Sequence, residues 1–495
     1  MESLNKVASA TRPNLNRGAA LLIALLVLMI AVAAIFLGPL SWLGMRTERE
    51  EINAEVLARA KAALIGYAAT FPEQNPASGS VLYVPGHLPC PDTASVCGSR
   101  GVSVIGLFPW QKLGLPVLKD ADGNCLWYAV SGNFKASPKA RLLNRDTLGQ
   151  LIVYGDDGST ALTPANHAAA VIFSAGPPLP GQNRTHDGSD CGGDLTPDHF
   201  LDSHGGINNS VINNAVEALT SLISRNPDSG FNDRLIWITP DELFQKTAEK
   251  RSDFERALFD TDYAANGSPA LAQRIAECIA AGFGSNNNYK RLPWAVPIAL
   301  PDSPPDTFRN TKFADVSNQF VGRVPFIVSN SVTAIGASQF APIPPATTTL
   351  SSCSGTNDSC RLLRTDNCPA DWSKVAGYPT GTDSPDGWWD KWKDHYFYAV
   401  SPAFKPGTGT PDCAIEKCVE LAGVKYAAIV IYSDRALAGQ QRLSLTDRNS
   451  PANYLEEDNV LAFTNDTSNP NFGKFKHAGN DKFVCITTSL TVAPC

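Results

Sequence analysis

The chain carries little charge for its length, and no stretch of it is strongly basic. Charged residues make up 18% of its 495 residues, with 48 Asp and Glu against 41 Lys and Arg. Proteins that bind nucleic acid present clustered Lys and Arg, so this balance disfavours a nucleic-acid partner. Glycine and proline are plentiful instead, at 38 and 36 residues. This composition favours a loop-rich, strand-containing exported protein over a helical cytosolic one.

The sequence also lacks the common short motifs of catalysis and metal binding. It contains no GxSxG nucleophile elbow, no HExxH, no GxxxxGK[ST] phosphate loop and no CxxC. No pair of histidines has zinc-like spacing beside cysteines. The densest polar cluster runs from His186 to His204, and we expect a surface loop there rather than a metal or catalytic site. These absences predict a protein that is not an enzyme.

No cysteine lies before Cys90, although the rest of the chain holds twelve. An even number confined to one part of the chain predicts disulfides formed in an oxidising compartment. Several cysteines lie close together in pairs, which suggests locally closed loops, but spacing leaves the connectivity open. The close pairs are Cys90/Cys97, Cys353/Cys360, Cys413/Cys418 and Cys485/Cys495, and Cys125 and Cys191 are further disulfide candidates.

The longest uncharged run lies near the N-terminus, between Ala19 and Met45. A helix of this length can cross the roughly 30 Å hydrocarbon core of a membrane. A short, mostly basic leader precedes the run, which predicts a cytoplasmic N-terminus and an exported remainder. Three interpretations are open. The run is a cleaved secretory signal cut at Ala31-Val32-Ala33, an uncleaved anchor, or an assembly segment that stays on the chain after the leader is removed.

The residues around this run favour the third interpretation. Arg17-Gly18 places a basic residue and a glycine directly before the run, and Gly38-Pro39 interrupts it, where proline must loosen a helix. An amphipathic helical pattern follows, from Ile52 to Ile65. Over residues 16–70 the chain resembles type IV pilins and type II secretion pseudopilins. In that family a long helix lies half in the membrane and half against a β-sheet head.

The resemblance implies processing of the N-terminus. A prepilin peptidase would cut between Gly18 and Ala19, and the new N-terminus would then be methylated. Ile23 stands at the fifth position of the mature segment, where major pilins carry a Glu that pairs with a neighbouring subunit. Its absence is typical of tip-type minor subunits of the family. The residues expected in the membrane and assembly helix are Leu21, Leu22, Ile23, Leu25, Leu26 and Pro39.

Beyond this segment the chain repeats itself. Five short matches recur in the same order, which is hard to produce by chance and predicts two copies of one module. The matches are Tyr128–Lys135 with Tyr398–Lys405; Ala170–Ser174 and Gly181–Arg184 with Ile429–Ser433 and Gly439–Arg442; Asn232–Thr239 with Asn480–Thr487; Phe108–Trp110 with Leu292–Trp294; and Ile65–Tyr67 with Ala281–Phe283.

These patterns together predict an α+β fold. A long N-terminal transmembrane/assembly helix would be followed by two tandem pilin-like modules, each a helix packed on an antiparallel sheet and tied by disulfides. The expected boundaries are residues 1–18 for the prepilin leader, 19–70 for the hydrophobic then amphipathic assembly helix, 71–240 for head module 1, 241–265 for a connecting helix or linker, and 266–495 for head module 2, with a Cys/Trp-rich insertion at about 295–395.

Two clusters are candidates for binding. Asp120 and Asp122 lie in an acidic loop that could offer oxygen ligands to Ca²⁺, but calcium takes about six to eight oxygens, so a plain turn is favoured. No other cofactor is expected. Trp388, Trp389 and Trp392 are candidates for a contact surface, because adjacent tryptophans on a strand cannot both point inward. A buried cluster under the insertion fits the tryptophans equally well.

Both copies also keep a Gly-Gln-x-Arg element and an Asn-Asp-Arg/Lys element. We expect these to be structural, since two working active sites in one chain would be unusual. A charge-assisted hydrogen bond between Arg184 and Asp233, and another between Arg442 and Asp481, could close equivalent loops.

The sequence therefore predicts a minor pilin or pseudopilin at or near the tip of a type IV pilus or type II secretion pseudopilus. The chain would be held in the inner membrane with a periplasmic head, and would then enter a periplasmic or cell-surface filament. The expected partners are other pilins or pseudopilins, a prepilin peptidase and the inner membrane. The alternative is a single-pass membrane-anchored periplasmic binding protein or hydrolase with no filament role.

Overall fold

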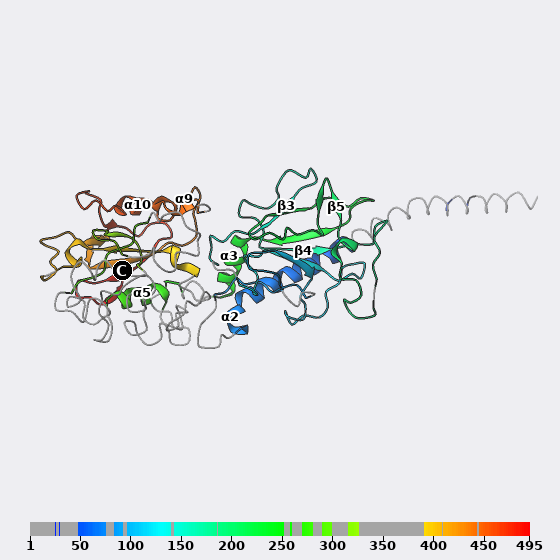
Figure 1. The fold of residues 1–495 in the computed structure, drawn as a ribbon, viewed down its shortest axis with the longest axis horizontal. Coiled ribbons are helices and arrows are strands. Elements are labelled where there is room, and N and C mark those ends of the chain that lie inside the picture. Colours follow the sequence, from blue (N-terminus) through cyan, green and yellow to red (C-terminus); the bar gives the residue numbers. More distant parts are fainter. Residues whose placement is uncertain are drawn as a thin grey trace, which may run out of the picture.

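Two modules follow one another in the computed structural model (Figure 1). Module 1 is formed by the described residues from 48 to 238, and module 2 by those from 270 to 495. The residues that the structure describes are 25, 29, 48–75, 84–92, 97–139, 143–185, 187–251, 258–259, 270–280, 290–298, 315–325, 391–407, 409–442 and 445–495.

Module 1 is built around an antiparallel four-stranded sheet in the order β1-β2-β4-β8. The helix of residues 48–69 packs on one face of this sheet (Figure 1). Leu57, Leu64 and Ala68 lie on its buried side at helical spacing and share a core with Tyr128 and Ile172. The short helix α2 (Phe71–Gln74) follows. The strands are β1 (Val104–Leu107), β2 (Trp127–Val130), β4 (Ala170–Ser174) and β8 (Arg234–Ile238).

The opposite face of the same sheet is covered by a second layer. Trp127 and Phe173 point into a separate core there, together with Phe200 and Leu222. Every residue of β2 and β4 is buried, because the sheet is covered on both faces. The second layer contains the parallel pair β3 (Leu151–Tyr154) and β7 (Thr220–Ile223), the small pair β5 (Ser203–His204) and β6 (Ile207–Asn208), and the 3-10 turn η1 (Pro197–His199).

Module 2 repeats this plan. Its sheet has the order β16-β15-β13-β10-β9, and helix α5 (Leu271–Ile279) contacts β13, β15 and β16. A second small sheet has the order β12-β11-β14. The strands are β9 (Val321–Arg323), β10 (Tyr396–Val400), β11 (Val419–Leu421), β12 (Val424–Tyr426), β13 (Ala428–Tyr432), β14 (Lys474–Phe475), β15 (Lys482–Ile486) and β16 (Val492–Pro494). The short helical elements are η7 (Lys393–His395), η8 (Pro402–Phe404), α9 (Leu445–Arg448), η9 (Pro451–Asn453) and α10 (Asp458–Ala462).

Helix α3 (Pro240–Lys250) lies between the modules (Figure 1). The side chain of Thr239 caps its start by accepting a hydrogen bond from the backbone N–H of Glu242. Its Phe244 ring packs against Trp392 of module 2, with ring centroids 5.9 Å apart. The main hydrophobic cluster therefore continues from module 1 into module 2.

Strand pairing places the repeats in register, with one shift from the sequence match. Tyr128 pairs with Ile172, and Tyr398 pairs with Val430, so Ala170–Ser174 corresponds to Ala428–Tyr432. The sequence match, with Ile429–Ser433, is one residue off. Such a shift would turn every side chain to the other face of the sheet.

A second match is also corrected by the structure. The phenol of Tyr128 donates to the carbonyl of Pro89, and that of Tyr398 donates to the carbonyl of Pro293, both at 3.2 Å. The counterpart of Leu292-Pro293 is therefore Leu88-Pro89 and not the segment beginning at Phe108. The helix match at residues 281–283 lies outside the described residues.

The predicted fold class was wrong. The described residues form a mixed α/β structure whose strands make several sheets, because the main sheets are apolar on both faces and need a second layer. The longest described helix has 22 residues. Among the described residues, no helix combines the length and the apolar character needed to cross a membrane. Leu25 is described as helical and exposed, whereas most of residues 19–45 lie outside the described part.

Candidate functional site

In each module, two buried carboxyl groups hold two loops together, because each accepts hydrogen bonds from the backbone of the other's loop. In module 1, Asp233 Oδ2 accepts from the backbone N–H of Asp202 at 2.8 Å and from Asn209 Nδ2 at 2.9 Å. In return, Asp202 Oδ2 accepts from the backbone N–H groups of Asn232 at 2.6 Å and of Asp233 at 3.2 Å. We call this reciprocal arrangement the carboxyl bracket.

Module 2 holds the same bracket between Glu456 and Asp481. Asp481 Oδ2 accepts from the backbone N–H of Glu456 at 3.2 Å and from Asn459 Nδ2 at 2.9 Å. Glu456 Oε2 accepts from the backbone N–H groups of Asn480 and Asp481, both at 3.1 Å. The bracket is therefore conserved between the modules although its first acid differs in length.

In each bracket the second acid has a raised pKa. Burial raises the pKa of Asp481 to about 8, and the neighbouring charge of Glu456 adds to the effect. Burial, followed by the charge of Asp202, likewise raises the pKa of Asp233 well above its usual value. The Oδ1 atoms of Asp233 and Asp481 are both buried and have no hydrogen-bond partner among the residues that the structure describes. The bracket of module 2 thus favours a protonated Asp481 at neutral pH.

An arginine closes the loop beside each bracket. Arg184 Nη1 donates to the carbonyl of Gly176 at 2.7 Å, and Arg442 Nη1 donates to that of Asp434 at 2.6 Å. The guanidinium of Arg184 lies 4.8 Å from the ring centroid of Phe200, and that of Arg442 lies 4.4 Å from Tyr454. In both Gly-Gln-x-Arg elements, the arginine therefore holds the loop by donating hydrogen bonds to backbone carbonyls.

The predicted partners of these arginines are different in the structure. The direct bonds expected from Arg184 to Asp233 and from Arg442 to Asp481 are not formed between these described residues. Besides the backbone carbonyls, the arginines donate to the side chains of Gln182 and Gln440, which belong to the same Gly-Gln-x-Arg elements. These glutamines in turn donate to the first acid of each bracket, Gln182 Nε2 to Asp202 Oδ1 at 2.9 Å and Gln440 Nε2 to Glu456 Oε1 at 3.5 Å.

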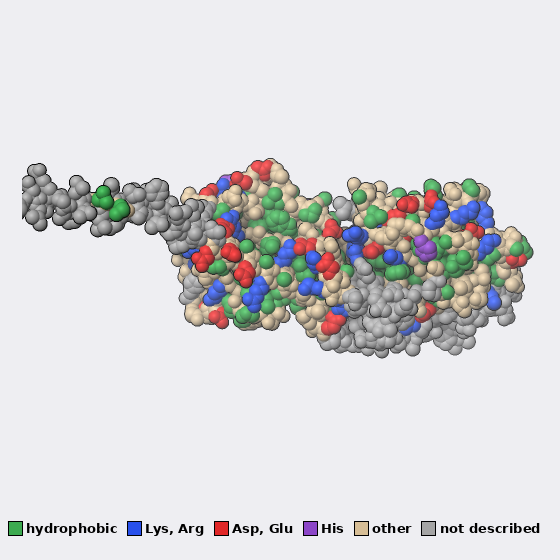
Figure 2. Space-filling model, turned by 180° about the vertical axis from the view of Figure 1, so that it is seen from behind, with side chains coloured by type: hydrophobic (Ala, Val, Ile, Leu, Met, Phe, Trp, Pro, Cys, Tyr) green, Lys and Arg blue, Asp and Glu red, His purple; other side chains and the backbone are tan. Residues whose placement is uncertain are grey.

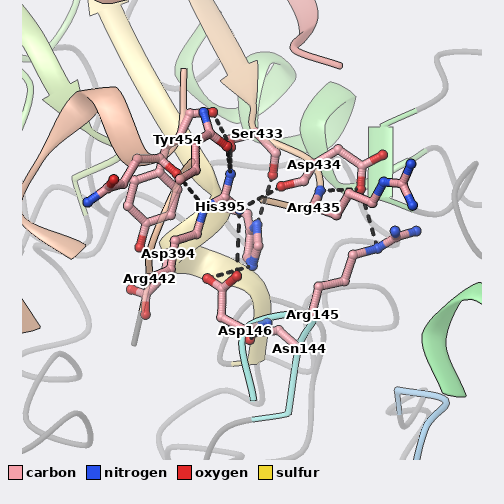
Figure 3. A network of polar contacts seen from close by, with 12 residues as sticks. Asn144, Arg145, Asp146, Asp394, His395, Ser433, Asp434, Arg435, Arg442 and Tyr454 are labelled. Atoms are coloured by element: carbon pink, nitrogen blue, oxygen red, sulfur yellow. Dashed lines mark hydrogen bonds and ion pairs between the residues drawn. The ribbon is translucent and has the colours of Figure 1, made fainter. Parts of the chain in front are cut away.

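A buried polar network joins the two modules (Figure 3). Asp146 of module 1 points toward module 2, where its Oδ2 lies 3.4 Å from His395 Nε2 and its Oδ1 lies 3.6 Å from Arg442 Nη1. Beside it, Arg145 Nε lies 3.3 Å from Asp434 Oδ1. Asn144 Nδ2 donates to the carbonyl of Lys391 at 2.9 Å. We call residues 144–148 the docking turn.

The tautomer of His395 follows from its neighbours. Nδ1 lies 2.8 Å from the carbonyl of Ser433, which can only accept, so Nδ1 carries a proton. Nε2 then faces the carboxylate of Asp146, and protonation there would complete an ion pair. Burial lowers the pKa of His395, the charge of Asp146 opposes that shift, and the charge of Arg442 adds to it. The network links a titratable group to the contact between the modules.

Other charged and aromatic groups surround His395. Arg323 Nη1 donates to the carbonyl of Asp394 at 2.9 Å. The ring of Trp392 lies 5.3 Å from that of His395, and the rings of Tyr432 and Tyr454 lie within 6.2 Å and 6.3 Å. This arrangement excludes water from the contact and strengthens its electrostatics.

The two candidate calcium ligands, Asp120 and Asp122, make hydrogen bonds and an ion pair within module 1. Asp120 is buried, and its Oδ1 accepts from the backbone N–H groups of Asp122 and Asn124, at 3.0 and 2.8 Å. Its Oδ2 accepts from the backbone N–H of Gly176 at 3.1 Å and from Ser174 Oγ at 3.3 Å. Asp122 pairs with Arg49 at 3.0 Å. Among the described residues, no group of three or more His, Cys, Asp or Glu side chains is placed to hold a metal ion.

The remaining predicted residues are placed as follows. Trp392 is fully buried and offers no exposed contact surface, because it packs at the contact between the modules. Disulfides join Cys90–Cys97, Cys413–Cys418, Cys485–Cys495 and Cys125–Cys191. Of the remaining candidates, Gly18, Ala19, Leu21, Leu22, Ile23, Leu26, Pro39, Cys353, Cys360, Trp388 and Trp389 lie outside the described residues.

Sequence reasoning missed the contact between the modules. Asp146, His395 and Arg442 are far apart in the chain, and no short motif contains them together. Arg442 was identified only as a repeated residue. Module 1 has Cys125 at the place of His395, so the histidine differs from its repeat counterpart, and this difference was the available signal.

Comparisons with known proteins returned no similar protein for this chain. No protein-family model matches it, and neither a curated protein nor a solved structure does.

Proposed function

We propose that this protein is a non-enzymatic structural component of a pilin-like filament system, with a two-module head that presents a surface to partners. The main support for this proposal is that the repeated polar side chains bind the backbone of their own module. Asp202 and Asp233, like Glu456 and Asp481, bond the backbone of their own module. Side chains that hold loops in both copies support a scaffold more than a catalyst.

The joined modules fit this role. The docking turn, the contact of Phe244 with Trp392 and the continuous hydrophobic cluster hold the modules together end to end (Figure 1). On the face of the molecule drawn in Figure 2, acidic and basic side chains are interspersed over module 1. The surface seen there suits protein contacts rather than an extended basic track.

The finer assignment rests on the N-terminal sequence. Arg17-Gly18 before an uncharged run, with Ile23 at the fifth position after the cut, supports a minor pilin or pseudopilin at or near the tip of a type IV pilus or type II secretion pseudopilus. A head of two modules would clash with its neighbours along a filament shaft. Before assembly the precursor would be held at the inner membrane, where a prepilin peptidase and other pilins would be its partners.

The processing of the N-terminus tests this assignment. The native chain, Gly18→Ala and the control Gly38→Ala are produced with a prepilin peptidase, and the N-terminal peptide is measured by mass spectrometry. We expect a methylated Ala19 in the native chain and in the control, and an uncut chain for Gly18→Ala. A native chain that keeps Met1 would favour the alternative of an anchored periplasmic protein and would overturn the filament proposal.

A further inference from the structure

The docking turn has a counterpart in module 2 that can be matched residue by residue. Strands β3 and β11 begin at Leu151 and Val419, and the turns lie at the same distance before them. In module 1, Asn144 Oδ1 accepts from the backbone N–H of Asp146 at 2.9 Å; in module 2, Asp412 Oδ1 accepts from that of Ala414 at 2.7 Å. The carbonyls of Asn144 and Asp412 also accept from equivalent N–H groups, at 3.0 and 3.2 Å.

In module 1 this turn inserts into the end of a sheet. Asp146 reaches His395, which precedes β10, and Arg442, which lies in the loop after β13. Arg145 reaches Asp434, which follows β13. The receiving place on module 2 is therefore the sheet end where β10 starts and β13 stops.

Module 1 has the same sheet end, and its own chain fills it. Gly176 follows β4 as Asp434 follows β13, since Arg184 and Arg442 bond these two carbonyls alike. Asp120 accepts from the backbone N–H of Gly176, and Asn124 Nδ2 donates to the carbonyl of Gly176 at 2.9 Å. Asp120 thus takes in module 1 the place that Asp146 takes in module 2. A second copy of this chain offers no open sheet end of this kind among its described residues.

The turn of module 2 is exposed and chemically different. Residues 414–417 are exposed, and Ile415 has 82% of its surface accessible. Ala414 stands in place of Asp146, and Ile415 in place of Thr147, so the turn presents an apolar side chain where the first turn presents an acid. The disulfide Cys413–Cys418 closes the turn, which reduces the entropy lost on binding.

We propose that residues 412–418 are a second docking turn, which binds the open sheet end of a module of the same construction on a different protein. The contact already formed inside the chain supports this docking: among the described residues, one turn is seated, both sheet ends are filled, and one turn is left exposed. Because Ala414 replaces the acid and the exposed Ile415 lies beside it, the partner's sheet end offers an apolar pocket rather than an arginine and a histidine.

Site-specific photocrosslinking in the producing cell, followed by a binding measurement, tests this proposal. A photoreactive residue replaces Ile415 in the full chain, and the control places it at Leu461 on α10, which is 56% exposed. The crosslinked protein is identified, purified and titrated against the native chain, Ile415→Asp and Leu461→Asp. We expect position 415 alone to capture a different protein with such a module, and Ile415→Asp to weaken its binding at least tenfold while Leu461→Asp does not.

Several outcomes would overturn the proposal. They are equal capture at both positions, capture of a second copy of this chain, capture of a protein without such a module, no capture at all, or equal affinity of the two variants. Both substitutions lie on the surface, and circular dichroism checks that the variants fold. The inference does not depend on cleavage at Gly18, so a docking partner outside any filament would support the turn while the filament proposal fails.

Discussion

Asp146 of module 1 lies 3.4 Å from His395 Nε2 in module 2, and this contact fills a sheet end that Asp120 fills in module 1. Module 1 thus provides the acidic side chain at both sheet ends: Asp146 at the sheet end of module 2, and Asp120 at its own. Since Nδ1 of His395 is held by the carbonyl of Ser433, only Nε2 is left to respond to the carboxylate.

Replacing Asp146 by Asn should lower the pKa of His395 further below its ordinary value. Burial already lowers this pKa, and Asp146 is the first of the groups that oppose the shift. Loss of this opposite charge should lower the pKa further, because the charge of Asp146 favours the protonated imidazole. Titration of the His395 ring by NMR measures the change, with Asp434→Asn as the control. An unchanged or higher pKa in Asp146→Asn would contradict the assigned contact.

The stability of module 2 should fall as the pH rises from about 4 toward 8. The pKa of Asp481 is raised to about 8 in the folded state, above its unfolded value near 3.9, so the folded state binds more protons in this window. Its contribution is complete below the unfolded pKa and is lost as the pH rises through the folded pKa. The expected loss is on the order of a few kcal/mol.

Asp481→Asn isolates this contribution. The amide keeps an acceptor for the N–H of Glu456 and for Asn459 but cannot ionise. Urea unfolding between pH 5 and 8 should show a flatter pH dependence in this variant than in the native chain. Asp458→Asn, at an exposed ion pair with Lys476, is the control and should leave the slope unchanged. An equal slope in native chain and Asp481→Asn would exclude the protonated bracket.

Arg442→Ala should destabilise the protein by about 3 to 5 kcal/mol, because it leaves Asp146 buried without its cationic partner. The same change also removes donors to the carbonyls of Asp434 and Asn453. Arg184→Ala is the matched variant in module 1. It should cost less, because Arg184 is partly exposed whereas the side chain of Arg442 is 1% exposed. Chemical denaturation gives both values, and equal costs would argue against a special role of the inter-module contact.

Gly322→Ala should destabilise module 2 strongly. A Cβ at this position would lie 1.8 Å from the carbonyl oxygen of Val296, so β9 could not keep its place beside that segment. Gly66→Ala is the control, since a Cβ there meets nothing within 4 Å and lies in helix 48–69. The control should stabilise the chain by about 0.5 to 1 kcal/mol through helix propensity. Thermal unfolding followed by circular dichroism compares the two, and similar midpoints would refute the close approach.

The repeat could be predicted from sequence better than its register. The matches of Tyr128–Lys135 with Tyr398–Lys405 and of Ala170–Ser174 with Ile429–Ser433 fall on strands in both modules, because strand propensity and burial act locally. The sequence match made Ile429 the counterpart of Ala170, whereas strand pairing makes Ala428 the counterpart. The register is set by which face packs on helix and second layer, and short stretches of similar apolar residues do not contain that information.

The sequence by itself determined the local features of this protein. Short spacing brings Cys90 close to Cys97 and Cys413 close to Cys418, since residues near one another in the chain meet in any compact fold. It also lets Thr239 cap the start of α3. Tertiary structure alone decided the second sheet layers and the meeting of Asp146 with His395. Contacts between residues hundreds of positions apart depend on how whole elements pack. That packing also decided that one docking turn is buried between the modules while its copy at Ile415 is exposed.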